Sequence, residues 1–321
     1  MKKLPDIQQS QNGFHKLPIN KVGVRNIKIP FSIQIPNQTK PFHTIASISS
    51  YCNLVSDVKG INMSRISRTI NDMTSKHDTC GVDNLTEFAY ELQRAHNTDD
   101  IYIKAEFDYS MSDTTPISNI VSMEPVHVIF ETTLIGEELH NYLTVKSTEM
   151  SLCPCSKEMS LLKNNMKEEE LAALKSADIS QELYDKIMMA GFGAHNQKSI
   201  IEVKIELNRE SQMVMWIEDL VHIIKLGSSC PTWSTLKRPD EKYVTEVSYM
   251  GGYFDENMKF NAVKSNGPKF VEDIARDIAS ELNFYLEHQV LDYVIVINNQ
   301  ESIHSENIMA TAILSAGLEL K

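Results

Sequence analysis

The segment that decides the fold is KFVEDIARDIASELNFYLEHQ (269–289), which leads into LDYVIVINN (291–299). The first part has the apolar spacing of one helix face, and the second is an apolar, β-branched run typical of a strand. Around it, SIIEVKIELN (199–208) predicts a strand, MVMWIEDLVHIIKLG (213–227) a helix and ATAILSAGLEL (310–320) a last strand. The C-terminal half therefore combines strands with a pair of helices.

A similar order is predicted in the N-terminal half. Its strand patterns are HTIASISSYCNLV (43–55), DIYIKAEFDYS (100–110) and a strand pair in 126–152, and its helix patterns are GINMSRISRTINDMTS (60–75) and VDNLTEFAYELQRAH (82–96). A strand–strand–helix–helix–strand–strand order thus occurs twice, although imperfectly. Runs of paired strands broken by paired helices indicate an α+β fold and not alternating βαβ units.

The composition of the 321 residues is that of a globular protein, with 42% hydrophobic and 23% charged residues. The net charge of −12, without a basic tail or stripe, argues against nucleic acid as a partner. No apolar run approaches the ~18 residues of a membrane span. The N-terminus lacks the apolar region of a signal peptide, so a cytoplasmic location is expected. Five cysteines in a reducing compartment disfavour structural disulfides.

The segment SLCPCSKEMS (151–160) places two thiols, Cys153 and Cys155, on either side of one proline. They could be metal ligands, or one could be a nucleophile with a histidine base. Lys157 could lower the pKa of a neighbouring thiol. The ordinary interpretation is a pair of small buried side chains. The residues alone leave these alternatives open.

A catalytic metal site usually has three protein ligands and one position for water or substrate. Besides the two thiols, the candidates are His195 in GAHNQKS, a carboxylate from KRPDEKYVTE (237–246), and Glu301 with His304 in ESIHSE. Common zinc-finger and zincin spacings do not occur. Spacing alone is therefore a weak indication of a metal.

Anion-binding candidates are found in two places. Arg65 lies in GINMSRISR at a predicted helix start, where free N–H groups attract anions. Lys237 and Arg238 lie in LKRPDEK, which we interpret as a loop before a strand. Each of them taken singly is more simply a solvated basic side chain. Similarly, Glu272 has Arg276 one helix turn away, as in an ordinary surface ion pair.

Five segments taken together, in this order, resemble the bacterial type IB GTP cyclohydrolases of the tunnelling-fold superfamily. They are SLCPCSKEMS, GAHNQKS, SCP followed by LKRPDEKYVTE, PKFVEDIARDIA and ESIHSE. The resemblance extends from about residue 43 onward. It implies a metal-dependent enzyme that converts GTP and water to 7,8-dihydroneopterin triphosphate and formate. This reaction is the first step towards folate and other pterins or deazapurines.

The resemblance also implies an architecture. Each subunit would contain two tunnelling-fold units, each a four-stranded antiparallel sheet with two helices on one face. Four subunits would form a homotetrameric barrel with active sites at their interfaces. We expect an extended N-terminal arm over 1–42, a first unit over 43–147 and a second over 148–321. The second unit would carry a helical insertion at 161–192 and a loop insertion at 250–266.

Residue by residue, the resemblance places the metal ligands at Cys153, His195 and Glu241, with one Zn, Mn or Fe ion per site. Cys155 matches a second cysteine near the metal, and an oxidative Cys153–Cys155 bridge would switch the site off.

The remaining roles concern the substrate. Glu272 matches a carboxylate that transfers protons, Glu301 the glutamate that binds the guanine edge, and His304 the histidine beside it. The cation candidates for the triphosphate are Arg65, Lys237 and Arg238.

Two features depart from the family pattern. Asn62 stands in G-I-N-M-S-R where the family usually has histidine. The insertion 161–192 separates Cys153 from His195, and both insertions would branch near the site. Two alternatives follow: a tunnelling-fold paralogue that acts on another purine or pterin or gives another product, such as a cyclic phosphate, and a non-catalytic scaffold. Retention of the polar site residues argues against the scaffold.

Overall fold

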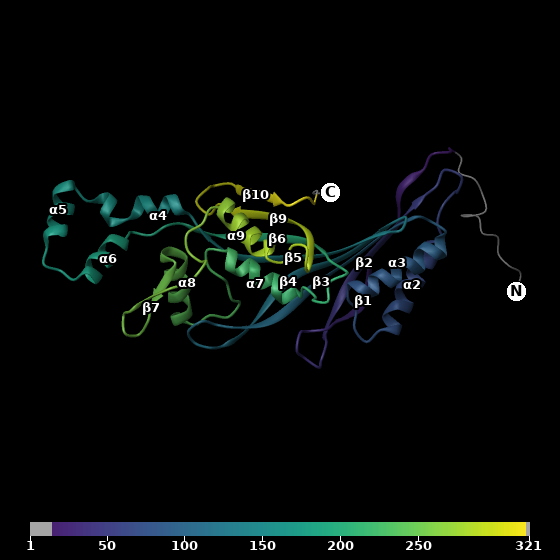
Figure 1. Ribbon diagram of the computed structural model, residues 1–321, viewed down its shortest axis with the longest axis horizontal. Coiled ribbons are helices and arrows are strands. Elements are labelled where there is room, and N and C mark those ends of the chain that lie inside the picture. Colours follow the sequence, from purple (N-terminus) through teal and green to yellow (C-terminus); the bar gives the residue numbers. More distant parts are fainter. Residues whose placement is uncertain (1–14, 319–321) are drawn as a thin grey trace, which may run out of the picture.

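The structure is a computed structural model and describes residues 15–318. Its main feature is one antiparallel sheet with the strand order β1-β2-β3-β4-β5-β6-β9-β10. The strands are β1 (Ile19–Ile33), β2 (Phe42–Leu54), β3 (Asp100–Thr114), β4 (Val121–Ile135), β5 (Glu138–Leu152), β6 (Asn196–Leu207), β9 (Val290–Gln300) and β10 (Met309–Ser315). The sheet runs along the long axis of the molecule (Figure 1).

Four helices cover one face of this sheet. They are α2 (Met63–Lys76), α3 (Val82–His96), α7 (Ile217–Gly227) and α9 (Val271–Asn283). Alternate strand residues point towards them, as the two-residue period of a strand requires. One cross-strand row shows this: Ile48, Ala105, Phe130, Leu143 and Ile205 are consecutive partners from β2 to β6, and all are buried in the same core as the helices.

The expected double order is present. β1, β2, α2, α3, β3 and β4 form the first half, and β5, β6, α7, α9, β9 and β10 form the second. The halves join through the β4–β5 hairpin, whose turn contains Gly136 at φ +61°. A positive φ is accessible to glycine at little cost. The α+β class with helices on one face of an antiparallel sheet is confirmed, and assembly into an oligomeric barrel stays a prediction.

The expected extended arm over 1–42 needs a correction. Residues 1–14 lie outside the described part of the chain, but Ile19–Ile33 form β1, which pairs with β2. Pro30 is compatible with this strand, because β1 lies at the edge of the sheet and pairs on one side only. A residue without an N–H is therefore tolerated there. The boundary expected at 147 falls within β5. Whether the two halves fold as separate units stays a prediction.

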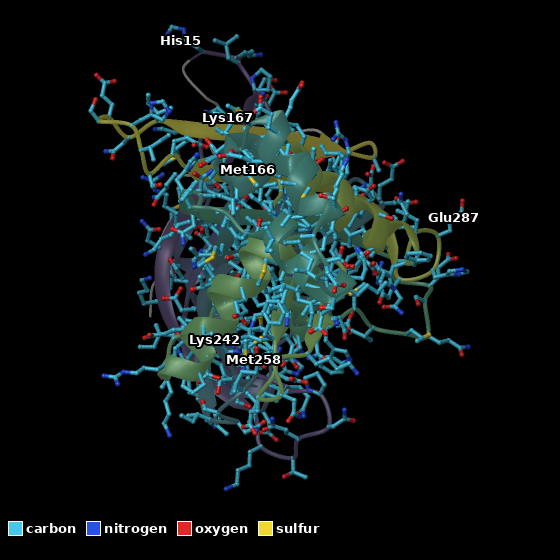
Figure 2. All side chains as sticks on the ribbon, turned by 90° about the vertical axis from the view of Figure 1, so that its left-hand side faces the viewer. His15, Met166, Lys167, Lys242, Met258 and Glu287 are labelled. Atoms are coloured by element: carbon cyan, nitrogen blue, oxygen red, sulfur yellow. The ribbon has the colours of Figure 1, made fainter. Side chains whose placement is uncertain are left out.

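The insertion at 161–192 forms helices, as expected. After α4 (Pro154–Ser160) come a 3₁₀ turn (Leu162–Asn165), α5 (Glu168–Ser176) and α6 (Gln181–Met189). This arm extends beyond the end of the sheet (Figure 1). Seen from that end, Met166 and Lys167 of the arm lie above Lys242 and Met258 (Figure 2).

The predicted loop before a strand at Lys237 and Arg238 is wrong, because α8 (Arg238–Met250) begins there. Pro239 occupies the first turn, where a missing N–H costs nothing. Gly251, at φ +73°, ends the helix in the left-handed region. The second insertion follows as a small hairpin of β7 (Gly252–Phe254) and β8 (Phe260–Ala262). Among residues 15–318, no helix is long and apolar enough to cross a membrane.

Candidate active site

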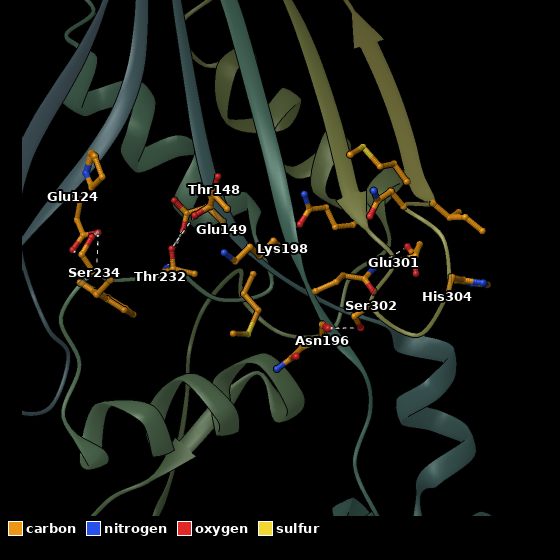
Figure 3. Close-up of a pocket in the computed structure, with 18 of the residues that line it drawn as sticks. Glu124, Thr148, Glu149, Asn196, Lys198, Thr232, Ser234, Glu301, Ser302 and His304 are labelled. Atoms are coloured by element: carbon orange, nitrogen blue, oxygen red, sulfur yellow. Dashed lines mark hydrogen bonds between the residues drawn. The ribbon is translucent and has the colours of Figure 1, made fainter.

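A hollow of about 1020 Å³ lies where β5 and β9 end and β6 begins. The start of β4 and the loops 231–234 and 301–308 complete its wall. Figure 3 shows Glu124 and Ser234 at one side of it, Glu301 and His304 at the other, and Lys198 between them. Because neighbouring strands are antiparallel, segments far apart in sequence meet at this edge.

The pairing of β5 with β6 brings Cys153 and His195 together. Leu152 and Asn196 are the last partners of this pair, so the residues that follow and precede them are adjacent. The Cys153 N–H donates to the His195 carbonyl oxygen at 3.2 Å. The insertion therefore begins and ends at the paired ends of β5 and β6. For this reason its length does not move Cys153 away from His195.

Local hydrogen bonds hold both residues. Cys153 is the N-cap of α4, and its Sγ accepts from the Ser156 N–H at 3.5 Å. The His195 N–H donates to Ser156 Oγ at 3.3 Å. The backbone at Cys153 and His195 is therefore held both by the end of the β5–β6 pair and by Ser156. All five cysteines of the chain carry free thiols.

A chain of two hydrogen bonds leads from His195 to Glu301. His195 Nδ1 is 2.9 Å from Gln197 Oε1, and Gln197 Nε2 donates to Glu301 Oε1 at 2.9 Å. Glu301 lines the hollow together with His304, whose N–H donates to the Glu301 carbonyl oxygen. Cys153 and His195 are thus backbone neighbours, and Gln197 links His195 to Glu301. Glu301 and His304 line the hollow, whereas Cys153 and His195 are not among its lining residues.

Glu241 does not join this group. It is exposed on the first turn of α8, whereas its neighbour Asp240 is fully buried. Asp240 accepts from the N–H groups of Ile117 and Ser118 at 3.0 and 2.9 Å, which ties α8 to the β3–β4 turn. Burial opposes ionisation of Asp240, but hydrogen bonds from Ser118 and from backbone N–H groups keep its pKa well below the ordinary value.

Within residues 15–318, no three His, Cys, Asp or Glu side chains are grouped so that they could hold a metal ion. Cys153 and His195 supply two suitable donors, and a third ligand is not in place. Their chemistry fits Zn²⁺ or another borderline ion. Whether Cys153, His195 and Glu241 together hold a metal ion stays a prediction.

The other predicted residues are not among those that line the hollow. Glu272 is exposed in the first turn of α9, and Cys155 is exposed on α4. Lys237 and Arg238 are exposed at the start of α8. Arg65 donates to the Ala95 carbonyl oxygen at 2.9 Å in the helix pair of the first half. The lining residues of the hollow include none of these side chains.

Glu149 is a lining residue that the sequence patterns did not single out. It is 2% exposed, accepts from Ser147 Oγ and from the Thr232 N–H at 2.8 Å each, and lines the hollow. Burial raises the pKa of Glu149 to about 7, although the Lys225 cation acts in the opposite direction. The period of two on β5 would have placed it on the buried face once the strand register was known.

A second buried carboxylate fixes the other side of the hollow. Both oxygens of Glu124 accept from the Ser234 N–H at 3.1 Å. Glu124 and Glu149 thus hold the backbone of loop 231–234 by its N–H groups. With Glu301 and Glu306, the lining contains four carboxyl groups and one lysine, Lys198. Such a lining suits a ligand that presents N–H donors.

Comparisons with known proteins agree on one family. Residues 4–310 match the family described as type I GTP cyclohydrolase folE2. A protein named GTP cyclohydrolase FolE2 from Dictyoglomus turgidum is 32% identical over 302 residues, which are 94% of this chain and 95% of that protein. Its namesake from Geobacter metallireducens is 32% identical over 312 residues, 97% of each chain.

Solved structures give only a distant likeness. Uricase from Arthrobacter globiformis has a TM-score of 0.46 at 7% identity, and the overlap covers 92% of each chain. Urate oxidase from Bacillus subtilis 168 has a TM-score of 0.40 at 8% identity, over 92% of this chain and 97% of that one. At this level the likeness carries no argument about fold or function.

Proposed function

The chain belongs to the type I GTP cyclohydrolase FolE2 family, and from this membership we infer that it is a GTP cyclohydrolase. It converts GTP and water to 7,8-dihydroneopterin triphosphate and formate, the first step of folate and pterin or of deazapurine synthesis. One structural observation carries this conclusion. Glu301, which lines a large hollow, is linked by hydrogen bonds through Gln197 to His195, the backbone neighbour of Cys153. We further propose subdivision IB and the tunnelling-fold superfamily, which the double ββααββ order supports.

Glu301 is the proposed guanine anchor. Each carboxylate oxygen has two lone pairs, so the bond from Gln197 leaves both oxygens able to accept. They would receive N1–H and the 2-amino group of guanine. Adenine presents no such donor pair, and a buried acceptor without its partner is costly. This gives selectivity for GTP over ATP.

We propose one divalent metal ion, with Cys153 and His195 as two of its ligands and Glu241 as the third. Bound there, the ion would supply a Lewis acid that lowers the pKa of water from 15.7 towards ~7. Because Asp240 holds the first turn of α8, Glu241 can take part only if that turn shifts. Its role is therefore the part of the ligand set that needs a separate test.

Proton transfers would fall to side chains that line the hollow. His304 keeps its proposed acid–base role, because it lies next to Glu301. Glu149 is suited to exchange a proton near neutral pH, since its pKa is raised to about 7. Glu272 lies on the exposed side of α9, so its proposed part in proton transfer requires contacts from outside this chain.

The triphosphate needs cations, and Lys198 is the one lysine or arginine among the lining residues. We propose that Lys237 and Arg238 flank the entrance. Arg65 would reach the site only from a neighbouring subunit, as the proposed homotetramer with interface sites would allow. A cytoplasmic location stays part of the proposal.

The test is turnover by metal-loaded protein, with GTP and ATP compared. Release of formate from GTP with a fluorescent pterin after oxidation supports the function, and release from ATP at a similar rate contradicts the proposed anchor. Cys153→Ala should abolish metal binding and turnover. Cys80→Ala, which removes a buried thiol of the first half, is the matched control and should retain both.

A further inference from the structure

We propose that Gln197 is a positioning residue that couples the two ends of the active site. It fixes the imidazole of His195 so that Nε2 faces its ligand, and it fixes the carboxylate of Glu301 that receives the purine. This coupling rests on the proposed function, because it concerns the same substrate and the same metal. Gln197 would act on the metal through His195 and on the purine through Glu301.

The direction of the Gln197 amide follows from hydrogen-bond chemistry. An ionised carboxylate can only accept, so the amide group that faces Glu301 must be the NH₂. The amide oxygen is then left for His195, 2.9 Å away. An oxygen can only accept, so the ring nitrogen that faces it, Nδ1, must carry the hydrogen.

The consequence for His195 is a defined tautomer. With hydrogen on Nδ1, the lone pair of the neutral ring lies on Nε2, which is the nitrogen free to bind a metal ion or accept a proton. Partners of this kind behind a metal-binding histidine typically contribute 10–100-fold in metal affinity. Gln197 would therefore act on the metal through His195.

The consequence for Glu301 is a defined orientation. Glu301 stands at the end of β9, where the backbone turns away, and its Oε1 is held by the Gln197 amide. A carboxylate already aligned loses less side-chain entropy when guanine binds. Gln197 would therefore act on the substrate through Glu301.

The bridge is rigid enough for this role. Gln197 is only 9% exposed and lies on β6, directly opposite Ser151 of β5. Ser151 Oγ accepts from Asn299 Nδ2 at 2.8 Å and donates to the Lys269 carbonyl oxygen at 3.2 Å. The strands β5, β6 and β9 are thus fixed to one another next to Gln197. A shift of His195 would therefore displace Glu301 as well.

Two substitutions separate the two ends. Gln197→Leu removes both hydrogen bonds. Gln197→Glu keeps an acceptor for the His195 N–H but places a second carboxylate against Glu301, where like charges repel. Gln181→Leu is the matched control, since Gln181 is an exposed glutamine on α6 that does not line the hollow.

Three quantities are measured for each variant: Co²⁺ affinity from the thiolate absorption band, GTP affinity of the metal-free protein, and kcat and KM. For Gln197→Leu we expect about a tenfold loss in both affinities. For Gln197→Glu we expect Co²⁺ affinity within about threefold of wild type, and GTP affinity and KM about tenfold worse. Gln181→Leu should change neither affinity.

Unchanged affinities in Gln197→Leu would overturn the coupling. So would an equal loss of Co²⁺ affinity in both Gln197 variants, because a purely structural role predicts that result. Wild-type protein without a thiolate–Co²⁺ band overturns the His195 end. If Gln197→Leu melts far below wild type, Gln197→Met is used in its place. Failure of the proposed function gives another result than failure of the Gln197 coupling: the wild-type protein then releases no formate, whatever the affinities of the variants.

Discussion

Replacing Glu149 by glutamine should make the protein more stable at pH 8 and leave its stability nearly unchanged at pH 4.5. The carboxyl group of Glu149 is buried, and its pKa is raised from 4.5 to about 7. Glutamine resembles the protonated acid in shape. Its amide oxygen can accept from the Thr232 N–H, and Ser147 Oγ can turn to accept from the amide NH₂.

The sign and size follow from proton linkage. Below the unfolded-state pKa the group is protonated in both states, so burial costs little. Between pH 4.5 and about 7 the unfolded chain has released this proton while the folded state still holds it, so stability falls over this range and levels off once both states are ionised. The difference between the two pKa values corresponds to about 3 kcal/mol at 1.36 kcal/mol per unit. The charged and titratable groups that act on Glu149 are Lys225 and Cys230.

The assay is urea unfolding of wild type and Glu149→Gln from pH 5 to 8, with a chelator present in both. The difference in free energy of unfolding cancels groups that titrate alike in the two proteins. It should grow by about 3 kcal/mol over this range. Glu306→Gln, which removes an exposed carboxyl of the same hollow, is the matched control. A flat difference for Glu149→Gln would refute the reasoning.

Three further predictions concern α8, the helix pair and the thiols. Asp240→Asn should lower the free energy of unfolding by about 3 kcal/mol in urea titrations, because the amide NH₂ that replaces Oδ2 cannot accept from the Lys237 N–H or from Ser118 Oγ; an unchanged midpoint contradicts this. Gly227→Ala should cost about 1–3 kcal/mol by thermal unfolding, since the new Cβ would lie 2.4 Å from Ile278 Cγ1; a wild-type Tm contradicts it. Cys155→Ala should remove a reversible loss of activity on oxidation, and wild type that resists oxidants contradicts the switch.

The strands and four core helices could be predicted because burial imposes a period on each of them. In β5 and β6 the alternation is direct, and in α9 the apolar face repeats along three turns. Two elements, β1 and α8, are not predicted by the sequence patterns. β1 contains Pro30 and polar residues on an edge, so its alternation is diluted. α8 buries only a narrow face around Val244 and Val247, so the sequence pattern at its start indicates a loop and not a helix.

The site was predictable in part for a physical reason. Cys153, His195 and Glu301 come together through strand pairing, which spacing in the sequence does not encode, and only the ordered motifs linked them. Glu149 needed the register of β5 before its side chain could be assigned to the buried face. Glu241 was assigned from its motif, but the hydrogen bonds of Asp240 decide where that turn lies.

The most direct test of the central claim is the fate of the C8 carbon of GTP. The metal-loaded protein is incubated with GTP labelled at C8, and labelled formate and the oxidised pterin are measured together. The account predicts labelled formate and neopterin triphosphate in equal amounts, both abolished by Cys153→Ala. Label that stays in the nucleotide, while the protein binds both metal and GTP, would contradict it.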